Sequence, residues 1–199
     1  MKKIFLVLLF FCLVRPAGAA GPLSALTTAG KGIDACDSDL FGKGADLNRI
    51  TRRAAEDILK RHARKGGDGA TAFLDAAAAA GAGNPAQAAL IAQLLASEMR
   101  SFAVSGINSC LFAGKEGARP VGAGGLFGPA LDKMPPGRRE IKAGRVLSQD
   151  KDYAEVTGIF SDPRAGDFPL VLALERQNGV WRIVEIKNVP ELVDRAAGR

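Results

Sequence analysis

The first half of the chain has a helical hydrophobic pattern. Between residues 23 and 112, apolar side chains recur every three or four positions, which is the spacing of one face of an α-helix. Glycine-containing clusters of turn-forming residues interrupt this pattern at residues 41–44, 65–69 and 81–85. The pattern therefore predicts three or four helices in this half of the chain.

Two of these helices are the most clearly defined. One carries an apolar stripe with Asp46 as its expected N-cap, at Leu47, Ile50, Ala54 and Ile58. The longest begins at Pro85, because proline is tolerated in a first turn, and its apolar positions continue the same period at Leu90, Ile91, Leu94, Leu95, Met99, Phe102 and Ile107. Both stripes are predicted to face a core, and charged residues in the longest helix exclude a membrane span there.

The second half changes to the alternating pattern of β-strands. Residue types favoured in strands predict them at residues 141–147, 153–160, 168–177 and 180–189. Asn178-Gly179 is a strong hairpin signal, because both central residues of that tight turn need positive φ. A block of helices followed by about four antiparallel strands predicts an α+β domain, with N-terminal helices packed on a curved C-terminal sheet.

The pattern divides the chain into four parts. These are a signal peptide (1–20), a helical part (21–113), a connection rich in glycine and proline (114–138), and an antiparallel β-meander with a short C-terminal helix (139–199) that forms one domain with 21–113. Connections of this length are uncommon in compact domains unless they cover a site or move, so one interpretation is a lid or the rim of a cavity, and the other is a poorly ordered linker. The sequence leaves both interpretations open.

The N-terminal segment is typical of an export signal. Lys2 and Lys3 precede an apolar run at residues 4–14, and the small residues Ala19 and Ala20 end the segment. As a helix the run would be about 16 Å long, roughly half the ~30 Å hydrocarbon core of a bilayer, which disfavours a permanent anchor. We therefore predict cleavage and a periplasmic or secreted location, with an uncleaved anchor as the alternative.

Export changes what the cysteines and the charge imply. Cys12 lies within the predicted signal, which leaves Cys36 and Cys110 in the mature chain. In an oxidising compartment we predict that they form a disulfide, with two separately buried thiols as the alternative. Losing the three basic residues of the signal lowers the formal net charge from +6 to +3. This mild charge predicts no nucleic-acid partner.

Motifs for cofactors, metals and catalysis are weak or absent. His62, the single histidine, lies in a basic cluster near a helix C-terminus, where cations disfavour its use as a base. The glycines at 122–128 lack the context of dinucleotide and phosphate loops. Asp34, Asp37 and Asp39 lack the glycine and the closing glutamate of a calcium loop. We predict no catalytic residue, no metal site and no cofactor.

Short segments give a resemblance to known proteins. Asp37-Ser38-Asp39-Leu40-Phe41, Ala45-Asp46-Leu47-Asn48-Arg49-Ile50 and the closing stretch at 172–183 resemble a broad group of exported bacterial domains of unknown function. Those domains are similar to the cystatin-like cone of the nuclear-transport-factor-2 superfamily. The resemblance implies a sheet curved around a cavity that binds an apolar ligand, serves an enzyme or is closed by packing. No catalytic residue of that superfamily matches this chain.

The leading functional hypothesis is a non-enzymatic binding domain. Its partner would be a small apolar molecule, a lipid or a protein, held in a concavity between sheet and helices. The predicted ligand-binding residues are Phe102, Phe127, Phe160, Leu172 and Trp181. For Trp181 the alternative role is packing within the core.

Two other functions remain as alternatives. One is a hydrolase or isomerase that uses carboxylates in the same cavity. The other is an electrostatic module that binds an anionic membrane surface or an acidic partner through Arg52, Arg53, Lys60, Arg61, Arg64 and Lys65.

Overall fold

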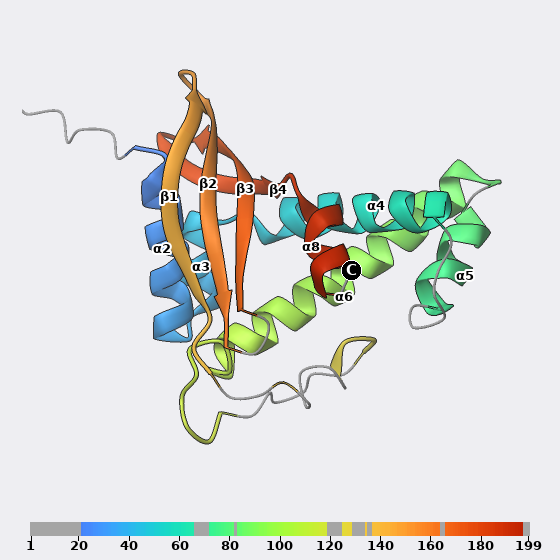
Figure 1. Cartoon of the computed structure of the whole chain (residues 1–199), viewed down its shortest axis with the longest axis horizontal. Coiled ribbons are helices and arrows are strands. Elements are labelled where there is room, and N and C mark those ends of the chain that lie inside the picture. Colours follow the sequence, from blue (N-terminus) through green and yellow to red (C-terminus); the bar gives the residue numbers. More distant parts are fainter. Residues whose placement is uncertain are drawn as a thin grey trace, which may run out of the picture.

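The computed structural model of this chain describes residues 21–65, 72–81, 83–118, 125–128, 134, 137–163 and 166–196. The predicted signal peptide and much of the predicted connection, and with them its role as lid or linker, lie outside the described residues. The chain has the predicted α+β fold, in which a block of helices precedes the sheet and a short helix follows it (Figure 1). Within the described ranges, no helix is long and apolar enough to cross a membrane.

Four strands form one curled antiparallel sheet in the order β1-β2-β3-β4. Their bounds are Glu140–Gln149 (β1), Tyr153–Asp162 (β2), Gly166–Gln177 (β3) and Val180–Ile186 (β4). The predicted hairpin turn is confirmed, because Asn178 and Gly179 have φ of 51° and 81°.

The prediction for the last strand was too long. β4 ends at Ile186, and Val189 begins helix α8 (Val189–Ala196) rather than ending a strand. Pro190 explains the change, because it has no N–H to give to a strand ladder and is tolerated in the first turn of a helix.

Five helices precede the sheet in the described part of the chain, rather than the predicted three or four. They are α2 (Leu23–Ala35), α3 (Ser38–Gly44), α4 (Leu47–Lys65), α5 (Ala72–Gly81) and α6 (Pro85–Asn108).

The unpredicted helix boundary lies at Cys36, whose left-handed backbone (φ 59°) ends α2. Asp37 then caps α3, and its Oδ1 accepts backbone hydrogen bonds from Asp39 and Leu40, each at 2.9 Å. The cluster at 41–44, predicted as a turn, is therefore helical. An N-cap aspartate just before the cluster outweighs the low helix propensity of its two glycines.

The predicted starts of α4 and α6 are confirmed. Asp46 Oδ1 accepts a hydrogen bond from the backbone N–H of Arg49 at 3.1 Å, as an N-cap does. Asn84 caps α6 in the same way, and Pro85 is the first residue of that helix.

The prediction for the buried face of α6 was partly wrong. Leu95 and Ile107 are buried as expected, but Leu90 and Leu94 are 57% and 61% exposed. Ala92 and Ala96 face inward instead. Small side chains let two helices approach closely, so α6 packs on α4 through its alanines rather than through all of its leucines.

The main core lies between the sheet and α2. It contains Leu26 of α2 and Leu172 and Leu174 of β3, whose exposed fractions are 0%, 2% and 0%. Helix α3 packs tightly on α2, since a Cβ on Gly32 would lie 2.4 Å from the backbone nitrogen of Phe41. A second, smaller cluster joins α4 to α6 through Ala55, Leu95 and Ala96.

Polar contacts fix the start of α4 on the sheet. The guanidinium of Arg49 donates two hydrogen bonds to the carboxylate of Glu175 on β3, at 2.5 and 2.7 Å. The hydrogen bonds from Arg49 hold the pKa of Glu175 below its usual value. The backbone N–H of Asp46 also donates to the carbonyl of Ile183 on β4, at 2.8 Å. Helix α4 therefore leaves the sheet in a defined direction.

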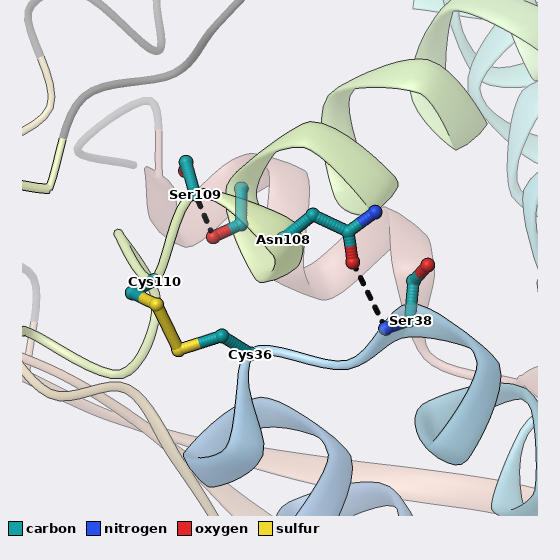
Figure 2. The surroundings of a disulfide bond; sticks show 6 residues. Cys36, Ser38, Asn108, Ser109 and Cys110 are labelled. Carbon is teal, nitrogen blue, oxygen red and sulfur yellow. Dashed lines mark hydrogen bonds between the residues drawn. A yellow bond between two sulfur atoms is a disulfide. The ribbon is translucent and has the colours of Figure 1, made fainter.

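The predicted disulfide between Cys36 and Cys110 is present. Figure 2 shows that it joins the end of α2 to the turn that follows α6. Beside it, the Asn108 side-chain oxygen accepts a hydrogen bond from the backbone N–H of Ser38 at 3.0 Å. The far end of α6 is thereby fixed to α2 and α3. Disulfides are typical of proteins in oxidising compartments, so the bond favours a location outside the cytoplasm.

Candidate functional site

A groove of about 850 Å³ lies between α4, α5 and α6. Its volume is within the roughly 300–1,000 Å³ range of small-molecule sites in proteins. Figure 1 shows these three helices extending beyond the edge of the sheet, away from α2 and α3. The groove is therefore separate from the main core.

One end of the groove is built mainly from small apolar side chains. This end is lined by Ala77 and Gly81 of α5, Ala88, Ala89 and Ala92 of α6, and Leu59 of α4, with Lys60 beside Leu59 as its charged residue. The contact between α5 and α6 is close there, since a Cβ on Gly81 would lie 3.0 Å from the Cβ of Ala88. Because alanine and glycine leave space that larger side chains would fill, this composition keeps the groove open.

The other end of the groove is polar. It is lined by Asn48, Thr51 and Arg52 of α4 and by Ser97 and Arg100 of α6. Thr51 is 5% exposed, and its hydroxyl donates to the carbonyl of Leu47 at 2.7 Å. The remaining polar side chains are exposed, and so their donors are accessible to a ligand.

The order of the helices explains this polarity. Helix α5 lies where α4 ends and α6 begins, so α4 and α6 run in opposite directions along the groove (Figure 1). The first turns of α6 consequently face the later turns of α4, while Arg100 faces the early turns that carry Arg52. From Ala88 to Arg100 the wall is about 18 Å long, at ~1.5 Å per helical residue.

The charge of the lining is mostly positive. Arg52, Lys60 and Arg100 contribute three cations, against the carboxylate of Glu56. Glu56 already has a cation near it, since its Oε2 lies 3.7 Å from Nη1 of Arg53. Neither Arg52 nor Arg100 has a hydrogen-bond or ion-pair partner among the described residues. The polar end therefore carries two guanidinium groups, one from each wall, with Glu56 one turn from Arg52 on α4.

The five predicted ligand-binding residues lie outside this groove. Leu172 and Trp181 belong to the main core, with exposed fractions of 2% and 3%, and Phe160 packs against it. Phe102 and Phe127 are brought together, with ring centroids 6.0 Å apart. They lie at the side of α6 where Glu98 Oε2 accepts from the backbone N–H of Leu126 at 2.7 Å. A ligand role for these five residues stays a prediction.

A second polar cluster lies on the sheet. Glu155 of β2 accepts hydrogen bonds from Lys187 and from the Tyr153 hydroxyl. The hydrogen bond from Lys187, and then that from Tyr153, hold the pKa of Glu155 below its usual value. Burial and the bond to Glu155 raise the pKa of Tyr153. Both shifts move away from neutral pH, the opposite of what general acid–base catalysis needs. The hydrogen bond from Lys187 to Glu155 joins β2 to the residue that follows β4.

The remaining predictions concern a metal site and the basic face of α4. The described residues contain no group of three or more histidine, cysteine or acidic side chains able to hold a metal ion. The side chains of His62, Arg64 and Lys65 lie outside the described residues, although α4 continues to residue 65. The complete basic face predicted for α4 therefore stays a prediction.

Comparisons with known proteins give no relative. The chain matches no protein family model, no curated protein and no solved structure. The groove and its charges are therefore interpreted from their own geometry.

Proposed function

We propose that this protein is a non-enzymatic binding protein that holds a small apolar molecule in the groove between α4, α5 and α6. The observation that carries the proposal is the apolar end of an 850 Å³ groove, built from alanine, glycine and leucine. Apolar concave sites with a few polar groups are the usual form of small-molecule sites. The proposal keeps the small apolar molecule among the partners expected from the sequence, and moves the site from the concavity between sheet and helices to the groove between three helices.

The main core supports this relocation. Between α2 and the sheet, the largest side chains are almost completely buried by one another. A ligand there would have to displace packed side chains, which costs free energy, whereas the helical groove needs no such displacement.

Nothing in this groove favours the hydrolase or isomerase alternative. Catalysis by paired carboxylates needs two acidic groups that converge on one site. Among the described residues that line the groove, Glu56 is the acidic one, and it lies beside Arg53.

We also propose that the protein is exported and acts in the periplasm or outside the cell. The disulfide supports this location, and the features of residues 1–20 favour it independently. Membership of the cystatin-like superfamily is a further proposal, supported by the curled antiparallel meander that follows the helices.

Filling the apolar end should weaken ligand binding. We expect Ala89→Phe to weaken the binding of the neutral dye 1-N-phenylnaphthylamine at least tenfold, because the phenyl ring occupies space that the dye needs. The dye becomes fluorescent in apolar surroundings, so a fluorescence titration gives the dissociation constant. Ala89 is exposed, and so the variant should fold.

Ala79→Phe is the matched control for this experiment. Ala79 is an exposed alanine of α5 that does not line the groove. The Ala79→Phe variant should bind the dye as tightly as the natural protein does. Both variants should have melting temperatures within about 2 °C of the natural protein's, because surface substitutions usually change the free energy of unfolding by less than about 0.5 kcal/mol. Equal affinity of Ala89→Phe and the natural protein would place the dye elsewhere and contradict the proposal.

A further inference from the structure

The proposed apolar ligand site has a second property, which is its polarity along the groove. The alanine-lined end lies beside α5 and contains one charged lining residue, Lys60, whereas the end with Arg52 and Arg100 lies about 18 Å away, at ~1.5 Å per helical residue. A ligand that satisfied both ends would need an apolar part and a negatively charged part at opposite ends. A molecule with these two parts is an anionic amphiphile.

The length of the groove corresponds to one hydrocarbon chain. A bilayer core is ~30 Å thick and contains two layers of acyl chains, so one chain spans about 15 Å. The two long walls of the groove, α4 and α6, contact each other through Ala55, Leu95 and Ala96. Helices in contact have axes about 8–10 Å apart, so a hydrocarbon chain lying along the groove would touch both of them.

The charge at the polar end selects an anion. Arg52 and Arg100 line this end from opposite walls, and Glu56, one turn from Arg52 on α4, is the acidic residue of the described lining. An anionic headgroup that reached both arginines would accept charge-assisted hydrogen bonds from two guanidinium groups. Asn48 and Ser97 add neutral donors at the same end. A neutral headgroup would bind more weakly, because its hydrogen bonds to the arginines would lack the attraction between opposite charges.

We propose that the ligand is a single-chain anionic amphiphile, with its headgroup between Arg52 and Arg100 and its hydrocarbon chain along Ala92, Ala89 and Ala88 toward α5. This inference rests on the proposed binding function and specifies its ligand class. Carboxylate and phosphate headgroups share the required chemistry. The ligand is a free molecule held within the groove, rather than the surface of a membrane.

Two probes with the same chain test the charge. cis-Parinaric acid carries a carboxylate, its methyl ester is neutral, and both report binding by fluorescence. We expect the natural protein to bind the acid about tenfold more tightly than the ester, and the preference to shrink as salt rises toward 1 M. The variant with Arg52→Gln and Arg100→Gln should bind the acid and the ester with equal affinity.

Arg145→Gln is the first control, because it removes an exposed cation from β1, which does not line the groove. It should keep the tenfold preference. Repeating the measurement with a long-chain alkyl phosphate distinguishes the two headgroups, and binding of either anion in preference to the ester supports the inference.

The other outcomes separate the two proposals. If neither probe binds, the binding function itself is wrong, and the inference falls with it. If acid and ester bind equally, the groove is an apolar site without charge selection, and only the inference is overturned. If the protein instead binds phosphatidylglycerol vesicles through Arg52 and Arg100 and neither probe in solution, the partner is a membrane surface, and the free-ligand proposal is overturned.

Discussion

Replacing both Cys36 and Cys110 with serine should lower the free energy of unfolding by about 4.5 kcal/mol. The disulfide closes a loop between residues 74 positions apart, and the unfolded chain loses the entropy of that loop. A typical domain is stable by only ~5–15 kcal/mol, so this is a large part of the total. Urea denaturation followed by circular dichroism measures the change.

The reduced natural protein is the control for the cysteine substitutions. Without the disulfide it should unfold at the same urea concentration as the double-serine variant, because both unfolded chains have the same freedom. A loss of less than about 1 kcal/mol in both would mean that the bond restricts the unfolded chain far less than its loop length implies.

Arg139→Met should lower the free energy of unfolding by about 3 kcal/mol. The Arg139 side chain is 4% exposed, its Nε donates to Asp162 Oδ2 at 2.8 Å, and its guanidinium lies 5.7 Å from the Phe112 ring centroid. Methionine keeps most of the apolar length but leaves the Asp162 carboxylate without this cation. The loss falls at the lower end of the ~3–5 kcal/mol range because the Asp162 side chain is still 16% exposed.

The neighbouring arginine provides the matched control. Arg138 forms ion pairs with Asp34 and Glu140, but its side chain is 57% exposed. Arg138→Met should therefore cost less than about 1 kcal/mol, as exposed ion pairs usually do. Chemical denaturation of both variants measures the difference. Equal losses for the two substitutions would show that burial does not set the strength of these pairs.

Local signals in the sequence predicted most of the secondary structure. The Asn178-Gly179 turn, the Asp46 cap and Pro85 each depend on residues close in the chain, and all three are confirmed. The boundary at Cys36 was missed because glycines at 41–44 gave the stronger turn signal. The boundary is set by the left-handed backbone of Cys36, which ends α2, and by Asp37, which caps α3.

The groove was not predicted, because it depends on how three helices pack. Hydrophobic periodicity identifies large apolar residues as the buried face, and on α6 this favoured Leu90 and Leu94. The structure exposes both and buries Ala92 and Ala96. One signal was available in the sequence: Ala88, Ala92 and Ala96 recur every four residues on the longest helix. Small residues at that spacing indicate close helix contact, but their position beside a groove follows only from the fold.

The cationic end was also present in the sequence, but in another context. Arg52 and Lys60 belonged to a basic face predicted for a membrane or an acidic partner. Arg100 is one of the charged residues of the longest helix that exclude a membrane span there. These residues lie on helices separated in the chain by α5, and the antiparallel packing of α4 and α6 brings them to one groove.

Photo-crosslinking tests most directly whether an anionic chain lies in the groove with its head at the arginines. A long-chain fatty acid with a diazirine at the end of its chain is bound, irradiated and mapped by peptide mass spectrometry. We predict labelling of α5 and the first turns of α6, around Ala77, Gly81 and Ala88, and loss of labelling in Ala89→Phe. Labelling concentrated beside Arg52, or within the core between α2 and the sheet, would contradict the proposed site.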